Sequence, residues 1–260
     1  MSDDKTGNEH PAAKIRSEQA RTLPKRFYSE AKAAARGSGH AVHLDGRPVK
    51  TPGKLVLILP TAAMAEAIAA EWAAQETLID PMSMPLTRIA NSVRDQVDGR
   101  EAAVRADMAK YGGSDLVCYR ADGPEGLVAA QADAWDPAVD WARETLGADL
   151  AVCAGLMPVT QSAASRAAIE AVVAPLEGFK LAAGHVMTTL LGSVVLALAV
   201  LHGRLSPDEA WRAAHVDEDW QAVKWGADAE ATARRDARFR EFLAAVRISE
   251  LAVAPPADAT

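Results

Sequence analysis

The spacing of apolar residues in the first third of the chain is that of strands. Val42 and Leu44 alternate with a polar residue, as in a half-buried strand, and Asp45-Gly46 is typical of a tight hairpin turn. Prolines at 48 and 52 cannot donate to a ladder and predict an edge strand. The run 55–59 is apolar throughout, which predicts a strand covered on both faces.

After residue 60 the apolar period becomes that of a helix. Thr61 can cap this helix, and Met64, Ile68 and Trp72 fall on one side of it. A helix with such a stripe can lie across the preceding strands. We therefore expect a compact α+β unit of strands and one covering helix.

The remainder of the chain predicts helices. The clearest start is Ser206-Pro-Asp-Glu209, which contains every element of a capping box. The segment 115–120 fits either a short strand or a helix. Helices are expected at 86–97, from there to Tyr111, and at 127–134, 137–146, 162–175, 181–201, 217–225 and 228–251.

These elements predict an α+β fold, in which a small N-terminal sheet-bearing domain precedes a larger all-helical C-terminal domain. The boundary is placed at Pro81-Met-Ser-Met-Pro85, because two prolines interrupt both helix and strand. The expected division is a disordered tail over 1–23, an α+β domain with a β-hairpin and covering helix over 24–82, a helical domain over 83–251, and a disordered tail over 252–260.

One segment is long enough to be weighed as a membrane span. Residues 181–203 contain no Asp, Glu, Lys or Arg, and a spanning helix needs about 20 apolar residues. The stretch also holds two histidines, two threonines, a serine and three glycines, so a buried core helix is the better interpretation, with no membrane insertion. Gly184, Thr188 and Gly192 recur every four residues and predict close approach of another helix.

Composition narrows the class of protein. The net charge of −7 and the pI near 5.4 make nucleic acid an unfavourable partner, because an acidic chain repels phosphate backbones. Two cysteines outside any C-x-x-C spacing are typical of a reducing compartment. The first ten residues fit neither a secretory signal nor a transit peptide. We expect a bacterial cytoplasmic protein, or one of the mitochondrial matrix if the source is eukaryotic and a presequence has been removed.

No motif in the sequence indicates catalysis. H-E-x-x-H, G-x-S-x-G and a phosphate-binding loop are all absent, and no catalytic, cofactor-binding or metal-binding residue is expected. The contiguous acids Asp217, Glu218 and Asp219 stand at a helix start, where the helix dipole favours negative charge. The alternative function is a small-molecule hydrolase or transferase that uses these helix-terminal carboxylates.

Five of the six tryptophans lie in the second half of the chain: Trp135, Trp141, Trp211, Trp220 and Trp225. They fit core filling in an aromatic-poor protein. They also fit anchors at a protein interface, where tryptophan is enriched.

Short motifs in a characteristic order support a family resemblance. The motifs are Arg26-Phe-Tyr, Leu44-Asp-Gly-Arg-Pro-Val-Lys-Thr-Pro, Ala70-Glu-Trp, Met84-Pro-Leu-Thr-Arg-Ile-Ala-Asn91, Asp115-Leu-Val-Cys-Tyr-Arg120, Gln131 with Trp135-Asp-Pro, Trp220-Gln and Trp225-Gly-Ala-Asp-Ala-Glu230. The chain resembles the assembly chaperone that attends the α subunit of the catalytic head of F-type ATP synthase, over about residues 25–250.

The resemblance implies a molecular chaperone with no enzymatic activity and no cofactor. Family members hold the free α subunit and shield its interface until the β subunit replaces them, and we expect this chain to be a monomer when free. A functional glutamate of the family falls at Glu230. The expected partner-binding residues are Glu230, Asp228, Trp225 and Trp220. Glu230 either contacts a basic group of the client or fixes its helix against the neighbouring domain.

Overall fold

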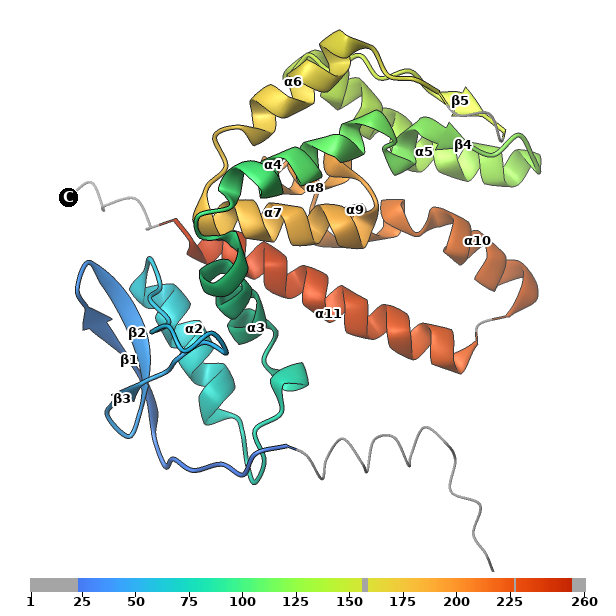
Figure 1. Ribbon diagram of the computed structural model, residues 1–260. Coiled ribbons are helices and arrows are strands. Elements are labelled where there is room, and N and C mark those ends of the chain that lie inside the picture. The colour runs from blue at the N-terminus through green and yellow to red at the C-terminus, as the bar shows by residue number, and fades with distance from the viewer. Residues whose placement is uncertain (1–22, 156–158, 227, 254–260) are drawn as a thin grey trace, which may run out of the picture.

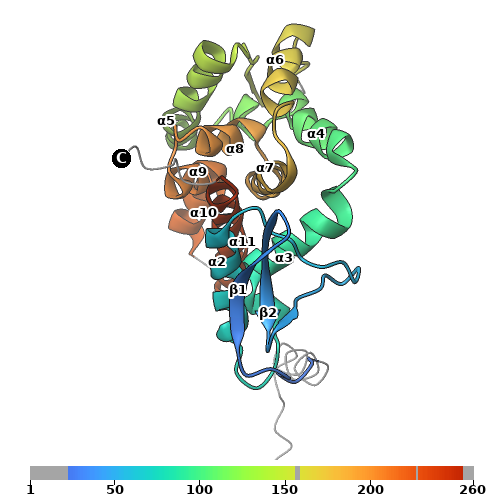
Figure 2. The same cartoon turned by 90° about the vertical axis from the view of Figure 1, so that its left-hand side faces the viewer.

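The computed structural model describes residues 23–155, 159–226 and 228–253. An antiparallel sheet with strand order β1-β2-β3 opens the fold, and α2 (Ala62–Ala73) covers it (Figures 1 and 2). The strands are β1 (Ala31–Arg36), β2 (Gly39–Leu44) and β3 (Arg47–Pro48). The two expected terminal tails lie almost wholly outside the described residues.

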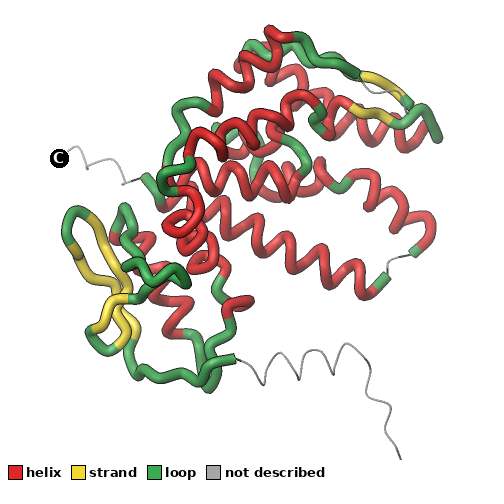
Figure 3. The backbone as a smooth tube through the Cα atoms, in the orientation of Figure 1, coloured by secondary structure: helices red, strands yellow, loops and turns green. Residues whose placement is uncertain are grey.

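The rest of the described chain is mostly helical, which confirms the α+β class with the sheet at the N-terminal end (Figure 3). Its α-helices are α3 (Pro85–Ser92), α4 (Glu101–Lys110), α5 (Glu125–Trp141), α6 (Ala163–Val173), α7 (Gly178–Leu191), α8 (Val194–Leu201), α9 (Pro207–Ala214), α10 (Val216–Trp225) and α11 (Ala229–Leu251). Shorter elements are the 3-10 turns η1 (Pro81–Ser83), η3 (Tyr111–Gly113) and η4 (Leu116–Cys118), the π-helical turns η2 (Val93–Val97) and η5 (Ala142–Leu146), and a parallel pair of two-residue strands, β4 (Tyr119–Arg120) and β5 (Cys153–Ala154).

The sheet agrees with the expected one at its hairpin turn and differs from it in two strands. The hairpin turn is confirmed, with Asp45 and Gly46 both at positive φ. The strand expected over 55–59 forms only isolated bridges, and it is not buried on both faces: Leu57 and Leu59 on one face are buried, whereas Val56 and Ile58 on the other face are only half-buried. The alanine-rich strand β1 was missed, because alanine has no strand preference of its own and the partner β2 makes it a strand.

Two expected helix boundaries were wrong. The apolar segment 181–201 is two helices rather than one, because Gly192 adopts a left-handed conformation with φ of 67° and ends α7. The two helices expected around 127–146 are instead one continuous α5 with Pro137 inside it, followed by η5. The close approach expected at Gly184 is present, since a β-carbon there would lie 3.2 Å from side-chain atoms of Leu201 and Met108. Within the described ranges, no helix is long and apolar enough to cross a membrane.

A carboxylate from α2 joins the sheet-bearing unit to the helices. The first turn of α3 has no capping side chain of its own. Glu71 supplies the acceptor instead: its carboxylate accepts hydrogen bonds from the Leu86 N–H at 2.7 Å, the Thr87 N–H at 2.8 Å and the Thr87 hydroxyl at 2.7 Å. Burial is the largest effect on this carboxyl and raises its pKa above the usual value. The motifs around residues 71 and 85 therefore form one contact.

Two further polar contacts fix the same junction. The Thr61 hydroxyl, which caps α2 as expected, also donates to the carbonyl of Leu251 at 2.6 Å. Asp95 of η2 accepts from the Thr51 hydroxyl at 2.6 Å and from the Gly53 N–H at 2.9 Å. Both ends of the helical region are thus bonded to the N-terminal unit, and one continuous hydrophobic core runs through both parts.

The ambiguous segment 115–120 is a 3-10 turn that leads into β4. Asp115 is fully buried, and its carboxylate accepts from the Val117 N–H at 3.2 Å and from the Val195 N–H at 3.1 Å. It therefore caps η4 and the distant α8 together. Desolvation raises the pKa of Asp115 to about 6.

Candidate interaction site

The helices α10 and α11 form an arm that projects from the helical body, at the right of Figure 1. No residue of α10 is buried, and the buried residues of α11 all lie in its second half, from Phe242 onward. The two helices meet at Gly226, whose φ of 87° ends α10. The tip of the arm is therefore surface that the core does not use.

Apolar side chains are exposed at this tip. Trp225 is 86% exposed and Val223 is 87% exposed, the two most exposed large hydrophobic side chains of the described residues. Leaving a tryptophan in water forgoes the stabilisation that its burial would give, and tryptophan is enriched where proteins bind one another. The tip thus has the character of an anchor for another protein.

Two acids follow the tryptophan in sequence, at the start of α11. Asp228 caps α11, its carboxylate accepting from the Ala231 N–H at 3.1 Å and the Glu230 N–H at 3.4 Å. The Glu230 side chain is 81% exposed, and its carboxylate pairs with the Arg234 guanidinium at 2.6 Å, one turn further along the same helix. Asp228 is thereby committed to the helix terminus, whereas Glu230 is open to a partner.

Trp220 has a different environment from Trp225. Its half-buried ring lies in a notch of α5, where Gly126 leaves the space: a β-carbon on Gly126 would collide with the ring. The ammonium of Lys224 lies 4.9 Å from the ring centre. Trp220 therefore holds α10 against α5, whereas Trp225, Asp228 and Glu230 are exposed at the end of α10 and the start of α11.

The tryptophans divide between the two expected roles. Trp135, Trp141 and Trp211 are buried in the core, and the indole N–H of Trp135 donates to the carbonyl of Ala213 at 2.6 Å. Trp225 alone of the five is strongly exposed. Core filling accounts for the first three, whereas Trp225 is not part of the core.

Two of the three acids at the start of α10 have structural partners. Asp217 accepts from the side-chain amide of buried Gln131 at 2.7 Å, and Asp219 accepts from both terminal nitrogens of the Arg235 guanidinium. These contacts tie α10 to α5 and to α11. The structure thus gives them a role in positioning the arm, and in the described part of the chain no cluster of three or more potential metal ligands occurs.

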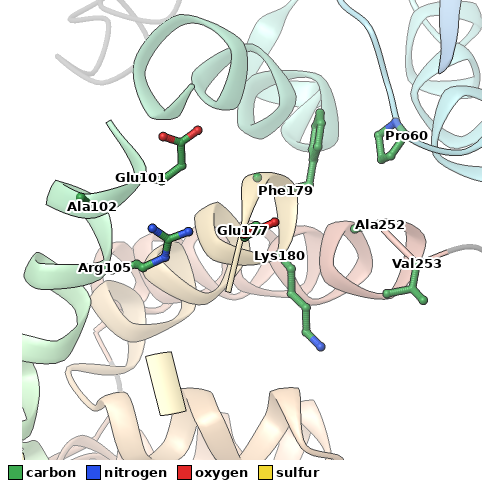
Figure 4. A pocket seen from close by; sticks show the side chains of 10 residues that line it. Pro60, Glu101, Ala102, Arg105, Glu177, Phe179, Lys180, Ala252 and Val253 are labelled. Atoms are coloured by element: carbon green, nitrogen blue, oxygen red, sulfur yellow. The ribbon is translucent and has the colours of Figure 1, made fainter. Parts of the chain in front are cut away.

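A second candidate is a hollow of about 710 Å³ at the junction of the two parts (Figure 4). Its wall contains Phe179 and Lys180 at the start of α7, Arg105 and Glu101 of α4, and Val253 after α11. Arg105 donates through Nε to the carbonyl of Leu176 at 2.8 Å. Charged side chains of both signs line the hollow. The sequence did not predict this hollow, because the residues that line it are distant from one another along the chain.

Comparison with known proteins gives consistent results. A family model described as ATP12 chaperone protein matches residues 25–143. The crystal structure of Atp12 from Paracoccus denitrificans is 43% identical and covers 88% of this chain and 99% of its own, with a TM-score of 0.83. An aspartate-to-lysine mutant of that Paracoccus protein is likewise 43% identical, covering 88% and 98%, with a TM-score of 0.82.

A third solved structure, Atu1473 from Agrobacterium tumefaciens, is 40% identical and covers 94% of this chain and 92% of its own, with a TM-score of 0.85. These likenesses extend well beyond the segment that the family model matches, and they confirm the resemblance drawn from the short motifs. The chain therefore belongs to the ATP12 chaperone family, whose members are non-enzymatic factors for ATP synthase assembly.

Proposed function

We propose that this chaperone binds the free α subunit of the F-type ATP synthase catalytic head through the tip of its α10–α11 arm. A subunit awaiting assembly exposes apolar interface surface, which self-associates unless it is covered. The observation that carries the proposal is the tip itself: Trp225 is exposed on a helix end beside an exposed acid, and no core residue covers it.

Release follows from mass action. A chaperone that binds only the free subunit stabilises it by a free energy that grows with the logarithm of the free chaperone concentration, and a tighter-binding partner displaces the chaperone. The β subunit is that partner in this proposal. The chaperone acts as a monomer in the compartment where the α subunit is made, which is the cytoplasm in a bacterium.

Glu230 is proposed to face the client rather than to stabilise the fold. Its ion pair with Arg234 lies on one exposed helix face, where such a pair contributes only about 0.3–0.5 kcal/mol. A presented carboxylate can instead meet a basic group of the client at the rim of the tryptophan contact, where complementary charge raises association rate and specificity.

The test is capture of isolated α subunit by the full-length chaperone. Trp225→Ala is expected to weaken capture at least tenfold, whereas Phe27→Ala, which removes another exposed aromatic ring far from the arm, is expected to leave it unchanged. Equal capture by both variants would remove the arm from the binding site.

A second pair of variants separates the two roles of Glu230. Glu230→Gln removes the charge, whereas Arg234→Ala removes the ion pair and keeps the charge. Weaker capture by Glu230→Gln alone supports contact with the client. If both variants weaken capture equally, Glu230 acts through its own helix, and the proposed contact is wrong.

A further inference from the structure

The strand β1 leaves one edge of the sheet without a partner among the described residues. In the strand order β1-β2-β3, β1 is an outer strand and pairs only with β2. An unpaired strand edge presents a row of backbone N–H and C=O groups that another strand can bond.

The hydrogen bonds of β2 identify which of its backbone groups face away from β1. His40 exchanges two backbone hydrogen bonds with Leu59, at 2.9 and 2.8 Å, and the carbonyl of Val42 accepts from the Val49 N–H at 2.8 Å. Since backbone groups alternate in direction along a strand, the odd-numbered residues of β2 face β1.

The register then assigns the groups of β1. Lys32 and Ala34 lie opposite two of these odd-numbered β2 residues and bond to them. Ala31, Ala33 and Ala35 therefore direct their N–H and C=O groups away from β2, toward the open edge. These three residues present three donors and three acceptors at the alternate spacing that a further strand requires.

The side chains of β1 leave this edge accessible. Its residues from Ala33 to Ala35 are all alanine, Lys32 and the last three residues of the strand are exposed, and Ala31 and Ala33 are half-buried. The other outer strand, β3, ends in Pro48, which has no N–H to offer. The sheet is thus closed to strand addition at β3 and open at β1.

The excess of positive charge around the three strands favours an acidic partner. Residues 30–54 contain five lysines or arginines and two acids, an excess of three positive charges in a chain whose net charge is −7. Both acids are already engaged: Glu30 pairs with Lys32 at 2.6 Å, and Asp45 accepts from the N–H groups of Ser29 and Glu30. Pairing with a second copy of this chain would bring two positively charged sheet edges together, and their like charges would repel.

We propose that the free edge of β1 binds an extended acidic segment of the client polypeptide by strand addition. The identity of the client rests on the proposed function. The open edge of β1, the outward direction of its backbone groups and the positive charge around it are independent of that function. Backbone hydrogen bonds along the added strand supply affinity with little demand on sequence, and the basic side chains select for acidic residues. The chaperone then holds its client at two separate places, the arm and the sheet edge.

Hydrogen exchange at single amides provides the first test. In the free full-length chaperone, the amides of Lys32 and Ala34 are protected by β2, whereas those of Ala31, Ala33 and Ala35 are not. On binding isolated α subunit, the latter three are expected to gain at least tenfold protection. Such alternation is specific to strand addition, so a complex in which none of the three gains protection overturns the proposal.

Substitution at an exposed edge residue provides the second test. Ala35→Pro removes an edge N–H that β2 does not use, whereas its control, Ala35→Thr, keeps that N–H and favours a strand. Capture of α subunit is expected to weaken at least tenfold with the proline and to be unchanged with the threonine. Arg36→Glu, which leaves the backbone intact, is expected to weaken capture even if the proline variant fails to fold.

The outcomes separate this proposal from the proposed function. If the wild type and all three variants capture α subunit equally, the strand addition is wrong and the function stands. If the wild type captures no α subunit, the proposed function fails and the client assignment fails with it. Concentration-dependent dimers of the wild type that Ala35→Pro abolishes would identify a second copy as the occupant and overturn the proposal.

Discussion

The contact between Glu71 and the first turn of α3 is expected to be a main support of the junction between the sheet-bearing unit and the helices. Glu71→Ala would remove the acceptor for two backbone N–H groups and one hydroxyl. No side chain of α3 can replace it, because the residue before that helix makes no capping hydrogen bond. The perturbation therefore acts on one helix terminus and removes no contact at the tip of the arm.

The size of the effect follows from these three hydrogen bonds. Loss of a helix cap costs about 0.5–2 kcal/mol, and a partly buried donor left without an acceptor costs about 1–3 kcal/mol. Burial already raises the pKa of Glu71, so part of the gain from the hydrogen bonds is offset by desolvation of the charge. We expect a net loss of about 3 kcal/mol in the free energy of unfolding.

Urea unfolding followed by circular dichroism measures this loss as a lower midpoint at unchanged slope. Glu66→Ala is the matched control, since it removes an exposed glutamate from the same helix α2. The control is expected to change stability by less than about 0.5 kcal/mol. If the two variants unfold at the same urea concentration, the reasoning about the cap is refuted.

Two further predictions concern the arm and the buried acid. Gly126→Ala would push the Trp220 ring out of its notch and lower stability by about 1–3 kcal/mol, with faster hydrogen exchange in α10. The control Gly113→Ala should do neither, since the nearest atom to its β-carbon would be the Arg166 side chain at 4.0 Å, an ordinary contact. The pKa of Asp115 is about 6 in the folded chain, above its ordinary value of 3.8. The stability that the protonated carboxyl contributes is therefore fully present below about pH 4 and is lost as the pH rises through about 6. The total loss is about 3 kcal/mol in the free energy of unfolding. In a pH series of unfolding measurements, Asp115→Asn should remove this component, and an identical pH dependence in the variant and the wild type would contradict it.

Local signals in the sequence were sufficient for several parts of the fold. The Asp45-Gly46 turn, the Thr61 cap and the capping box at Ser206 were all predicted and are all present. Each depends on residues within three or four positions of one another, so the backbone geometry they favour is already encoded in the segment itself. The period of apolar residues likewise placed most of the helices.

Other features depend on partners far away in the chain. A run of alanines favours a helix when considered alone, and β1 is a strand only because β2 offers it a ladder. Pro137 lies within α5 although proline predicts a helix end. Asp115 bonds to a residue eighty positions away, and no local pattern identifies that partner.

The candidate site shows the same division. The sequence by itself determined that Trp225, Asp228 and Glu230 lie close together, because they are nearly contiguous at one helix start. Only the tertiary structure decided that Trp225 is exposed while Trp220 fills a notch at Gly126, and that β1 keeps an open edge. Exposure depends on how distant elements cover one another, and a linear pattern records which side chains are apolar but not which of them find a neighbour.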